Sequence, residues 1–179
     1  MQHPLARDLE HVLANTTDVW DALRGERIFI TGGTGFVGTW LIESLVWANR
    51  RLNLNAQAVV LTRNPDAFRA KAPFSANDAS VHLVKGSLQN FEFRDDDCAF
   101  VIHAATDQVA PSRDEPAGTF DRELNGTRRV LEYVRARGVK RLLFTSSGAV
   151  YGRQPSDLMN IPEGYAGAPP PLEPGPAYG

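Results

Sequence analysis

A glycine-rich turn between two apolar runs constrains the fold of this chain more than any other feature. The turn is Thr31-Gly32-Gly33-Thr34-Gly35-Phe36-Val37-Gly38, which follows the apolar run 28–30 and precedes the apolar stretch 40–47. These flanks predict a strand, a tight loop and a helix in direct succession. Glycines allow close backbone approach to an anion, and the helix N-terminus offers unpaired N–H groups and a positive dipole end. The pattern therefore predicts a turn that binds the pyrophosphate of a dinucleotide.

The glycine spacing by itself does not identify such a turn. Gly32, Gly35 and Gly38 follow a G-x-x-G-x-x-G pattern rather than G-x-G-x-x-G, although Gly33 adds a fourth glycine. An ordinary turn is the alternative that glycines alone would leave open. The strand-like run before the turn and the helical apolar face after it favour cofactor binding.

The remaining apolar pattern predicts an α/β fold. Short apolar runs recur at 58–61, 81–84, 100–102 and 141–144, and an amphipathic segment at 120–137 ends at Gly138. Nearly continuous apolar runs separated by helical or polar segments are typical of a parallel sheet covered by helices on both faces. We therefore expect a doubly wound parallel sheet, in which residues 26–152 form the cofactor-binding domain.

Two flanking segments differ from this pattern. Residues 1–25 have apolar side chains at helical spacing and predict an N-terminal helical extension, for which packing against the outside of the sheet is favoured over binding a partner. Prolines interrupt residues 153–179, which predicts a long loop over the site.

Composition excludes several classes of function. The 179 residues can form one domain, and the net charge of −2 provides no basic field for nucleic acid or an anionic membrane. The single cysteine, Cys98, cannot form an internal disulfide. The first residues lack the apolar core of a signal peptide, and no apolar run approaches the roughly 18 residues that span a bilayer. We expect a cytoplasmic protein.

Several segments together form a specific pattern. In chain order they are the glycine-rich turn, Val101-Ile102-His103-Ala104-Ala105, Asn125-Gly126-Thr127, Ser146-Ser147, Val150-Tyr151-Gly152 and Pro176-Ala177-Tyr178-Gly179. With these segments the chain resembles, from about Arg27 to Gly179, the N-terminal part of the extended short-chain dehydrogenase/reductase superfamily, which contains NAD(P)-dependent nucleotide-sugar epimerases and dehydratases. The resemblance implies a Rossmann fold that stops before the C-terminal substrate lobe.

The resemblance assigns catalysis to Ser147, Tyr178 and a lysine four positions after the tyrosine, beyond Gly179. A tyrosine hydroxyl with a pKa of about 10 is a poor base unless positive charge stabilises its phenolate, and the lysine and the oxidised nicotinamide supply that charge in the family. Ser147 would bond the same sugar hydroxyl, so that hydride leaves the carbinol carbon as Tyr178 removes the proton. Without the lysine we expect this chain alone to be inactive. The structural alternatives are that Ser147 caps a turn and that the terminal Tyr178 is disordered.

The resemblance also implies a set of cofactor contacts. An acidic residue after the second strand would favour NAD, whereas an arginine can hold the extra phosphate of NADP. Here the strand ends at Arg63 with no acid in the matching position, which favours NADP and leaves NAD as the alternative, since redox-neutral epimerases of the family often keep NAD. Ser87 stands where the family commonly has an aspartate, and it would contact adenine more weakly. The expected cofactor-binding residues are Gly32, Thr34, Gly35, Phe36, Val37, Gly38, Arg63, Ser87, Leu88, Ala104 and Ala105.

The substrate is expected to be a nucleotide sugar. Gly148 and Ala149 offer no proton donor after Ser147, which disfavours a dehydratase and favours epimerisation or 4-keto reduction. Residues 63–65 and 147–152 are most similar to a bacterial group in surface-polysaccharide sugar metabolism. A dinucleotide-binding sensor without turnover is the alternative from another class.

Other clusters predict little chemistry. The run 95–97 of three aspartates is expected to form a solvated turn, so no metal is predicted, and His103 is assigned to packing. A sheet that ends after its fifth strand would expose apolar surface, which predicts low solubility or self-association. A homodimer is expected for the full-length protein.

Overall fold

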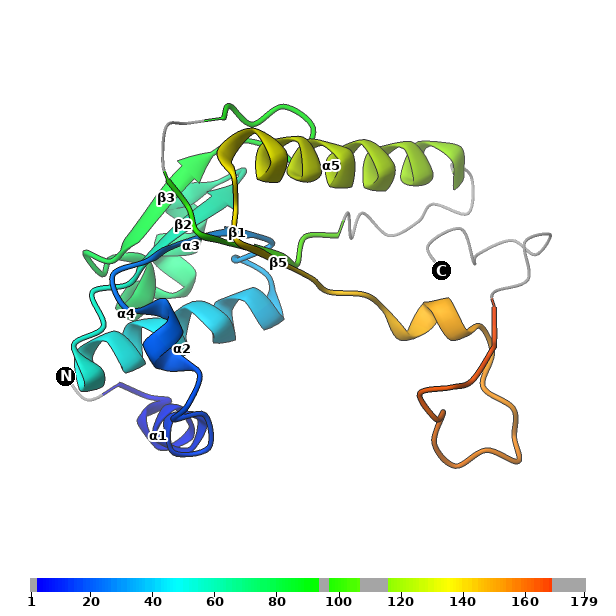
Figure 1. The fold of residues 1–179 in the computed structure, drawn as a ribbon, viewed down its shortest axis with the longest axis horizontal. Helices are drawn as coiled ribbons and strands as arrows, with labels where there is room; N and C mark the ends of the chain where they lie inside the picture. Colours follow the sequence, from blue (N-terminus) through cyan, green and yellow to red (C-terminus); the bar gives the residue numbers. More distant parts are fainter. Residues whose placement is uncertain (1–2, 94–96, 107–115, 169–179) are drawn as a thin grey trace.

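A computed structural model describes residues 3–93, 97–106 and 116–168 of the chain. Its centre is a five-stranded sheet of order β3-β2-β1-β4-β5, in which every neighbouring pair is parallel (Figure 1). This order confirms the predicted doubly wound α/β fold. The strands are β1 (Arg27–Thr31), β2 (Gln57–Thr62), β3 (Val81–Lys85), β4 (Phe100–His103) and β5 (Arg141–Phe144).

Helices lie on both sides of the sheet. In Figure 1, α5 lies on one side and α1, α2 and α4 lie on the other. Right-handed crossovers place helices this way, since each parallel connection must return to the same end of the sheet. The helices are α1 (Ala6–Ala14), α2 (Phe36–Leu52), α3 (Pro65–Lys71), α4 (Pro73–Ala76) and α5 (Pro116–Arg137), with short 3-10 turns η1 (Trp20–Leu23) and η2 (Gly148–Tyr151).

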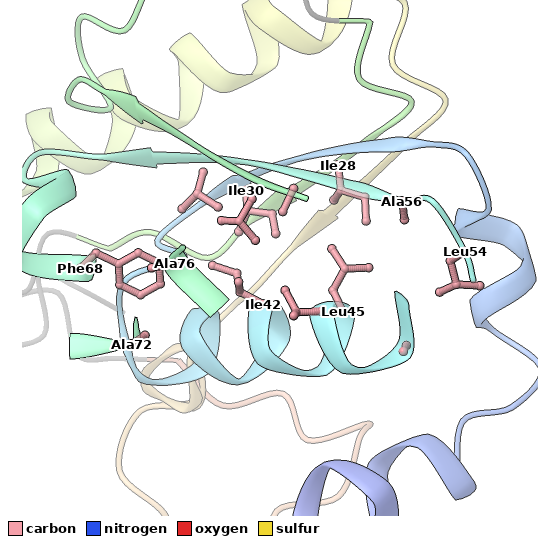
Figure 2. Close-up of a cluster of buried hydrophobic side chains, with 14 of the residues drawn as sticks. Ile28, Ile30, Ile42, Leu45, Leu54, Ala56, Phe68, Ala72 and Ala76 are labelled. Atoms are coloured by element: carbon pink, nitrogen blue, oxygen red, sulfur yellow. The ribbon is translucent and has the colours of Figure 1, made fainter. Parts of the chain in front are cut away.

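The first core layer fills the space between α2 and the sheet. Ile42 and Leu45 of α2 pack toward Ile28 and Ile30 of β1, and all four side chains are buried (Figure 2). Burial of each such side chain contributes roughly 1.5–3 kcal/mol. This layer fixes α2 under β1, so the N-terminus of α2 is held directly after the glycine-rich turn.

The second core layer lies between the sheet and α5 and is rich in aromatic rings. Phe29 of β1 contacts Phe91 and Tyr133 at ring-centroid distances of 5.3 and 4.7 Å. The connection from β3 to β4 closes this layer without a helix in residues 86–93 or 97–99. Instead, Arg129 and Arg137 of α5 donate hydrogen bonds to the carbonyls of Phe91 and Phe93, at 2.9 and 2.6 Å. In a helix these carbonyls would accept hydrogen bonds from backbone N–H groups, and here the two arginine side chains supply the donors instead.

The predicted N-terminal extension is helical, as α1, but it packs against α2 rather than against the sheet. The Nε2 atom of His3 forms a hydrogen bond with the carboxylate of the buried Glu43 of α2 at 2.8 Å. The Ser75 hydroxyl donates to the same carboxylate at 2.8 Å. Trp20 of η1 joins the core layer under α2. The extension therefore covers the outer side of α2. The division of the chain into domains at 1–25, 26–152 and 153–179 stays a prediction.

The structure contains two short helices that the sequence did not predict. Helices α3 and α4 were not predicted, because each begins at a proline, Pro65 and Pro73, that resembles a turn signal and yet suits the first position of a helix. The sheet is covered on both faces at β1 and β2, whereas β5 is exposed, as the sequence predicts for the fifth strand. Leu143 and Phe144 of β5 are 55% and 54% exposed. Residues 152–168 are irregular, as predicted, and lie beyond the end of β5 (Figure 1).

Within the described residues, no helix is both long and apolar enough to cross a membrane.

Candidate functional site

The glycine-rich turn lies at the carboxyl end of β1, beside the carboxyl end of β4. Gly32 has φ of +72°, and a Cβ atom there would lie 2.4 Å from backbone atoms of Ala104 and Ala105. The Ala104 N–H donates to the Thr31 carbonyl at 3.1 Å and holds the two strand ends together. Only glycine fits this position, because both the backbone conformation and the close approach exclude a side chain.

The same turn packs tightly on the start of α2. A Cβ atom at Gly38 would lie 2.2 Å from the Gly32 carbonyl oxygen and 2.5 Å from the Gly33 Cα. Gly35 is the N-cap of α2, and the first intrahelical bond runs from the Thr39 N–H to the Gly35 carbonyl at 3.0 Å. The side-chain-free positions therefore bring the helix N-terminus directly against the turn.

The start of α2 offers an anion site that fits a pyrophosphate. The N–H groups of residues 36–38 precede the first intrahelical bond and have no acceptor within the helix. Phe36 and Val37 are 80% and 55% exposed, whereas Gly38 is buried against the turn. Three free donors at the positive end of a 17-residue helix suit a diphosphate.

One basic residue lies directly after β2 and another at the end of α3, and the second contacts the glycine-rich turn. Arg63 follows β2 directly and is exposed, and Asn64 caps α3 by accepting the Ala67 N–H at 3.1 Å. Lys71, at the end of α3, donates from Nζ to the Thr34 carbonyl at 2.7 Å. The sequence analysis missed Lys71, because α3 was not predicted and no local pattern connects residue 71 to the turn.

Ser87 and Leu88 follow β3 at the same edge of the sheet. The Ser87 hydroxyl donates to Asn90 Oδ1 at 2.8 Å, which closes a short turn. Leu88 packs against α5 at Gly126, where a Cβ atom would lie 3.1 Å from the Leu88 Cβ. The structure thus gives both side chains a local packing role, and their predicted contacts with the cofactor stay predictions.

His103 ends β4 beneath the turn and is only 2% exposed. Its Nδ1 lies 2.7 Å from the hydroxyl of Thr31, and its Nε2 lies 3.2 Å from the hydroxyl of Thr127 on α5. Burial lowers the pKa of His103 below its ordinary value, and the negative charge of Glu123 acts in the opposite direction. The predicted packing role is therefore accompanied by hydrogen bonds to two other elements.

Ser147 lies after β5, at the same edge of the sheet. It is the N-cap of η2, and its hydroxyl accepts the Ala149 N–H at 3.1 Å, which is the turn-capping alternative considered from the sequence. The hydroxyl proton stays free to bond a substrate. Tyr178 lies outside the described residues, as do Asp95 and Asp96 of the acidic run. No group of three metal-ligating side chains occurs in the part of the chain that the structure describes.

Comparison with known proteins agrees with this geometry. The model of the NAD dependent epimerase/dehydratase family matches residues 28–179. UDP-glucose 4-epimerase of Streptomyces lividans is 32% identical over 133 residues, which are 70% of this chain and 37% of that protein. Vestitone reductase of Medicago sativa is 30% identical over 69% of this chain and 38% of its own length. The chain thus spans well under half the length of these relatives.

Solved structures show the same fold. The Bordetella bronchiseptica enzyme WbmG, solved in complex with NAD, is 25% identical and has a TM-score of 0.59 over 80% of this chain and 44% of that one. A UDP-N-acetylglucosamine 4-epimerase of Methanobrevibacter ruminantium has a TM-score of 0.64 at 20% identity, over 87% of this chain and 47% of that one, and supports the fold alone. With the family model matched from β1 to the last residue, the chain belongs to the NAD-dependent epimerase/dehydratase family.

Proposed function

We propose that this protein binds NAD or NADP and acts on a nucleotide sugar, with epimerisation as its reaction. The observation that carries the proposal is the start of α2, where the N–H groups of residues 36–38 have no acceptor within the helix and follow a turn that cannot carry side chains at Gly32 or Gly38. A pyrophosphate fits these donors, since its charge and oxygens match several convergent N–H groups.

Each element at the carboxyl edge of the sheet contributes to the proposed cofactor site. The turn would hold the pyrophosphate through the backbone of Gly32, Thr34, Gly35, Phe36, Val37 and Gly38. The small side chains of Ala104 and Ala105 would allow the nucleotide to approach the end of β4. Ser87 and Leu88 follow β3, where we propose that the adenine lies. Ligands of doubly wound sheets bind at this edge, in the crevice between strands of opposite connection.

The residues after β2 support NADP over NAD. Arg63 and Lys71 are both exposed cations close to this end of the sheet, and no carboxylate occupies residues 62–64. An arginine can bond a 2′-phosphate through several N–H groups, whereas a carboxylate would repel it. The enzyme WbmG was solved with NAD, so NAD is the alternative that the experiment must include.

Ser147 and Tyr178 are the proposed catalytic pair. When bound, the nicotinamide supplies a reversible acceptor for hydride from a sugar carbon. Ser147 would donate a hydrogen bond from its hydroxyl to the sugar oxygen and so orient the sugar. Tyr178 would take and return the proton of the same sugar hydroxyl. Gly148 and Ala149 provide no acid for loss of water, which supports epimerisation over dehydration.

Two other functions remain as proposals with specific support. The similarity to a vestitone reductase supports 4-keto reduction, which would use the same residues with NADPH as the hydride donor, oxidised to NADP in each turnover. A dinucleotide sensor would need the turn but neither Ser147 nor Tyr178. A homodimer, and a role in surface-polysaccharide sugar metabolism, complete the proposal and rest on the family resemblance.

Calorimetric titrations with NAD and with NADP, performed separately, test cofactor binding. Turnover is then assayed with UDP-glucose and related nucleotide sugars, in a chain that includes the lysine expected four positions after Tyr178. Epimerisation without net cofactor consumption supports the proposed reaction, and stoichiometric NADPH oxidation supports the reductase. Tight cofactor binding with no turnover on any sugar would favour the sensor, and absence of binding to either dinucleotide would refute the proposal.

A further inference from the structure

We propose that His103 is a positioning residue, whose imidazole joins Thr31 and Thr127 and thereby holds the glycine-rich turn in the shape that binds the dinucleotide. The inference rests on the proposed function, because it gives His103 a role in that same site. It concerns the buried layer beneath the turn, which makes none of the proposed contacts with the cofactor.

The geometry places His103 between three elements. Thr31 is the last residue of β1 and is fully buried, and its hydroxyl lies 2.7 Å from Nδ1. Thr127 belongs to α5, and its hydroxyl lies 3.2 Å from Nε2 on the opposite side of the ring. His103 thus joins the ends of β1 and β4 to the helix that covers them. The three residues are separated by 72 and 24 positions in the chain, so the link is entirely tertiary.

An imidazole suits this link for a chemical reason. In its neutral form one ring nitrogen donates and the other accepts, and each threonine hydroxyl can do either. Neutral His103 therefore satisfies both contacts at once. An apolar side chain of similar size would leave the buried Thr31 hydroxyl and the half-buried Thr127 hydroxyl without these partners, and an unpaired buried polar group is costly.

The position of Thr31 matters because the residues that follow it in the turn are held by close backbone contacts. The Thr31 carbonyl accepts the Ala104 N–H at 3.1 Å, and the next residue, Gly32, approaches the backbone of Ala104 and Ala105 closely. The Gly32 carbonyl in turn accepts the Gly35 N–H at 3.0 Å. A shift of Thr31 would therefore pass directly into the turn and move the N–H groups of residues 36–38.

The neighbours of the ring distinguish this role from proton transfer. The Phe144 ring of β5 lies 5.4 Å from the imidazole, and the Thr106 hydroxyl donates to Glu123 at 3.0 Å on the α5 side. Glu123 is the charged side chain that acts on His103 among the described residues. With Thr31 fully buried and the imidazole 2% exposed, the ring is closed off from a substrate. His103 therefore acts through Thr31 on the shape of the turn.

Two substitutions separate the two halves of the link. In His103→Asn the side-chain amide reaches only the position of Nδ1, so it can still bond Thr31. In His103→Gln the amide reaches the position of Nε2, so it can bond Thr127 but not Thr31. Thr31→Val and Thr127→Val remove the same contacts from the other side. The exposed His82 of β3 provides the control His82→Gln.

Three measurements are made on each variant: affinity for NAD and NADP, amide hydrogen exchange of residues 32–38 without cofactor, and the unfolding temperature. We expect His103→Gln and Thr31→Val to weaken cofactor binding about tenfold and to speed exchange in the turn, as loss of a buried hydrogen bond predicts. We expect His103→Asn and Thr127→Val to lose less affinity than these two variants, because each keeps the contact with Thr31, and we expect His82→Gln to stay within about threefold of the unchanged protein.

The pattern among variants decides the inference. A purely structural role would lower the unfolding temperature of His103→Asn and His103→Gln alike and leave affinity unchanged well below that temperature, and this result would overturn the proposal. Unchanged exchange in His103→Gln would also overturn it. If the unchanged protein binds neither dinucleotide, the proposed function fails, while faster exchange of residues 32–38 in His103→Gln and Thr31→Val, and not in His82→Gln, still supports the positioning role.

Discussion

Lys71 donates a hydrogen bond from its Nζ to the backbone carbonyl of Thr34 at 2.7 Å, and so ties the end of α3 to the glycine-rich turn after β1. The two residues are 37 positions apart. An ammonium group is thereby held beside the donors proposed to bind a pyrophosphate. Lys71 therefore contributes both to the shape of the turn and to its positive potential.

Substitution of Lys71 by Met should weaken dinucleotide binding about three- to tenfold at low salt, because one exposed charge near a phosphate contributes modestly. The difference in affinity between the two proteins should shrink as the salt concentration rises, because salt screens the charge of Lys71 in the unchanged protein. Calorimetric titration at two salt concentrations measures the effect. Lys140→Met is the matched control, since Lys140 is exposed and pairs with Glu26 at 2.6 Å near the opposite ends of the strands. Equal losses in both variants would show that Lys71 has no specific role.

Gly38→Ala should abolish cofactor binding and lower the unfolding temperature, because its new Cβ would lie 2.2 Å from the Gly32 carbonyl oxygen. Backbone must move to relieve such a contact, and the first turn of α2 moves with it. Gly164→Ala is the control, since nothing lies within 4 Å of a Cβ at that position. Binding titration and thermal unfolding of both variants check this. Wild-type affinity in Gly38→Ala would exclude this turn as the pyrophosphate site.

Arg63→Asp should reverse the cofactor preference, with NADP weakened at least about tenfold and NAD unchanged or improved. The substitution removes the proposed partner of a 2′-phosphate and introduces a carboxylate that suits a ribose. Affinities for both dinucleotides are measured on the two proteins. Arg153→Asp, at an exposed position after η2, controls for net charge. NAD bound tenfold more tightly than NADP by the unchanged protein would refute the preference itself.

The free energy of unfolding should depend on pH through His103. Burial lowers its pKa in the folded state below the ordinary value of 6.5, despite the opposing charge of Glu123, so the unfolded chain binds a proton more readily. This contribution is fully present above about pH 6.5 and is lost as the pH falls below it toward the folded pKa. Urea unfolding at pH 7.5 and 5.5 should show a smaller decline in His103→Asn than in the unchanged protein.

Asp78 does not complicate that measurement. Burial acts to raise the pKa of its carboxyl, but hydrogen bonds from Ser80 and Arg50 lower it overall, below 3.8. Its contribution to stability is present above that value and is lost only in stronger acid. An identical decline between pH 7.5 and 5.5 in both proteins would show that His103 is not the group responsible.

Apolar exposure at β5 should cause self-association of this chain. Leu143 and Phe144 are about half exposed, and β5 is an edge of the described sheet, so a second chain can bind there. Sedimentation at several concentrations should show dimers or larger species, and Leu143→Glu should raise the monomer fraction. Leu52→Glu, at a less exposed position at the end of α2, is the control. A stable monomer at all concentrations would contradict the expectation.

The elements that the sequence predicted are those specified by local patterns. All five strands were predicted from near-continuous apolar runs, which are typical of parallel strands that helices cover on both faces, and β5 has such a run although it is exposed. The missed helices α3 and α4 are short and begin at Pro65 and Pro73, and proline is equally a turn signal and a first helical residue. These helices depend on packing of Phe68, Ala72 and Ala76 into the core, and a short stretch of sequence does not show that packing.

The amino-acid sequence alone determined the sheet, the glycine-rich turn and the family, because strand-forming runs and backbone positions that tolerate only glycine are properties of neighbouring residues. The tertiary structure decided which distant groups support that turn. The contacts of Lys71 with Thr34 and of His103 with Thr31 and Thr127 join residues far apart in the chain, and they exist only because parallel strands place their carboxyl ends along one edge. Such contacts depend on the packed sheet and helices, which bring together residues that no sequence pattern links.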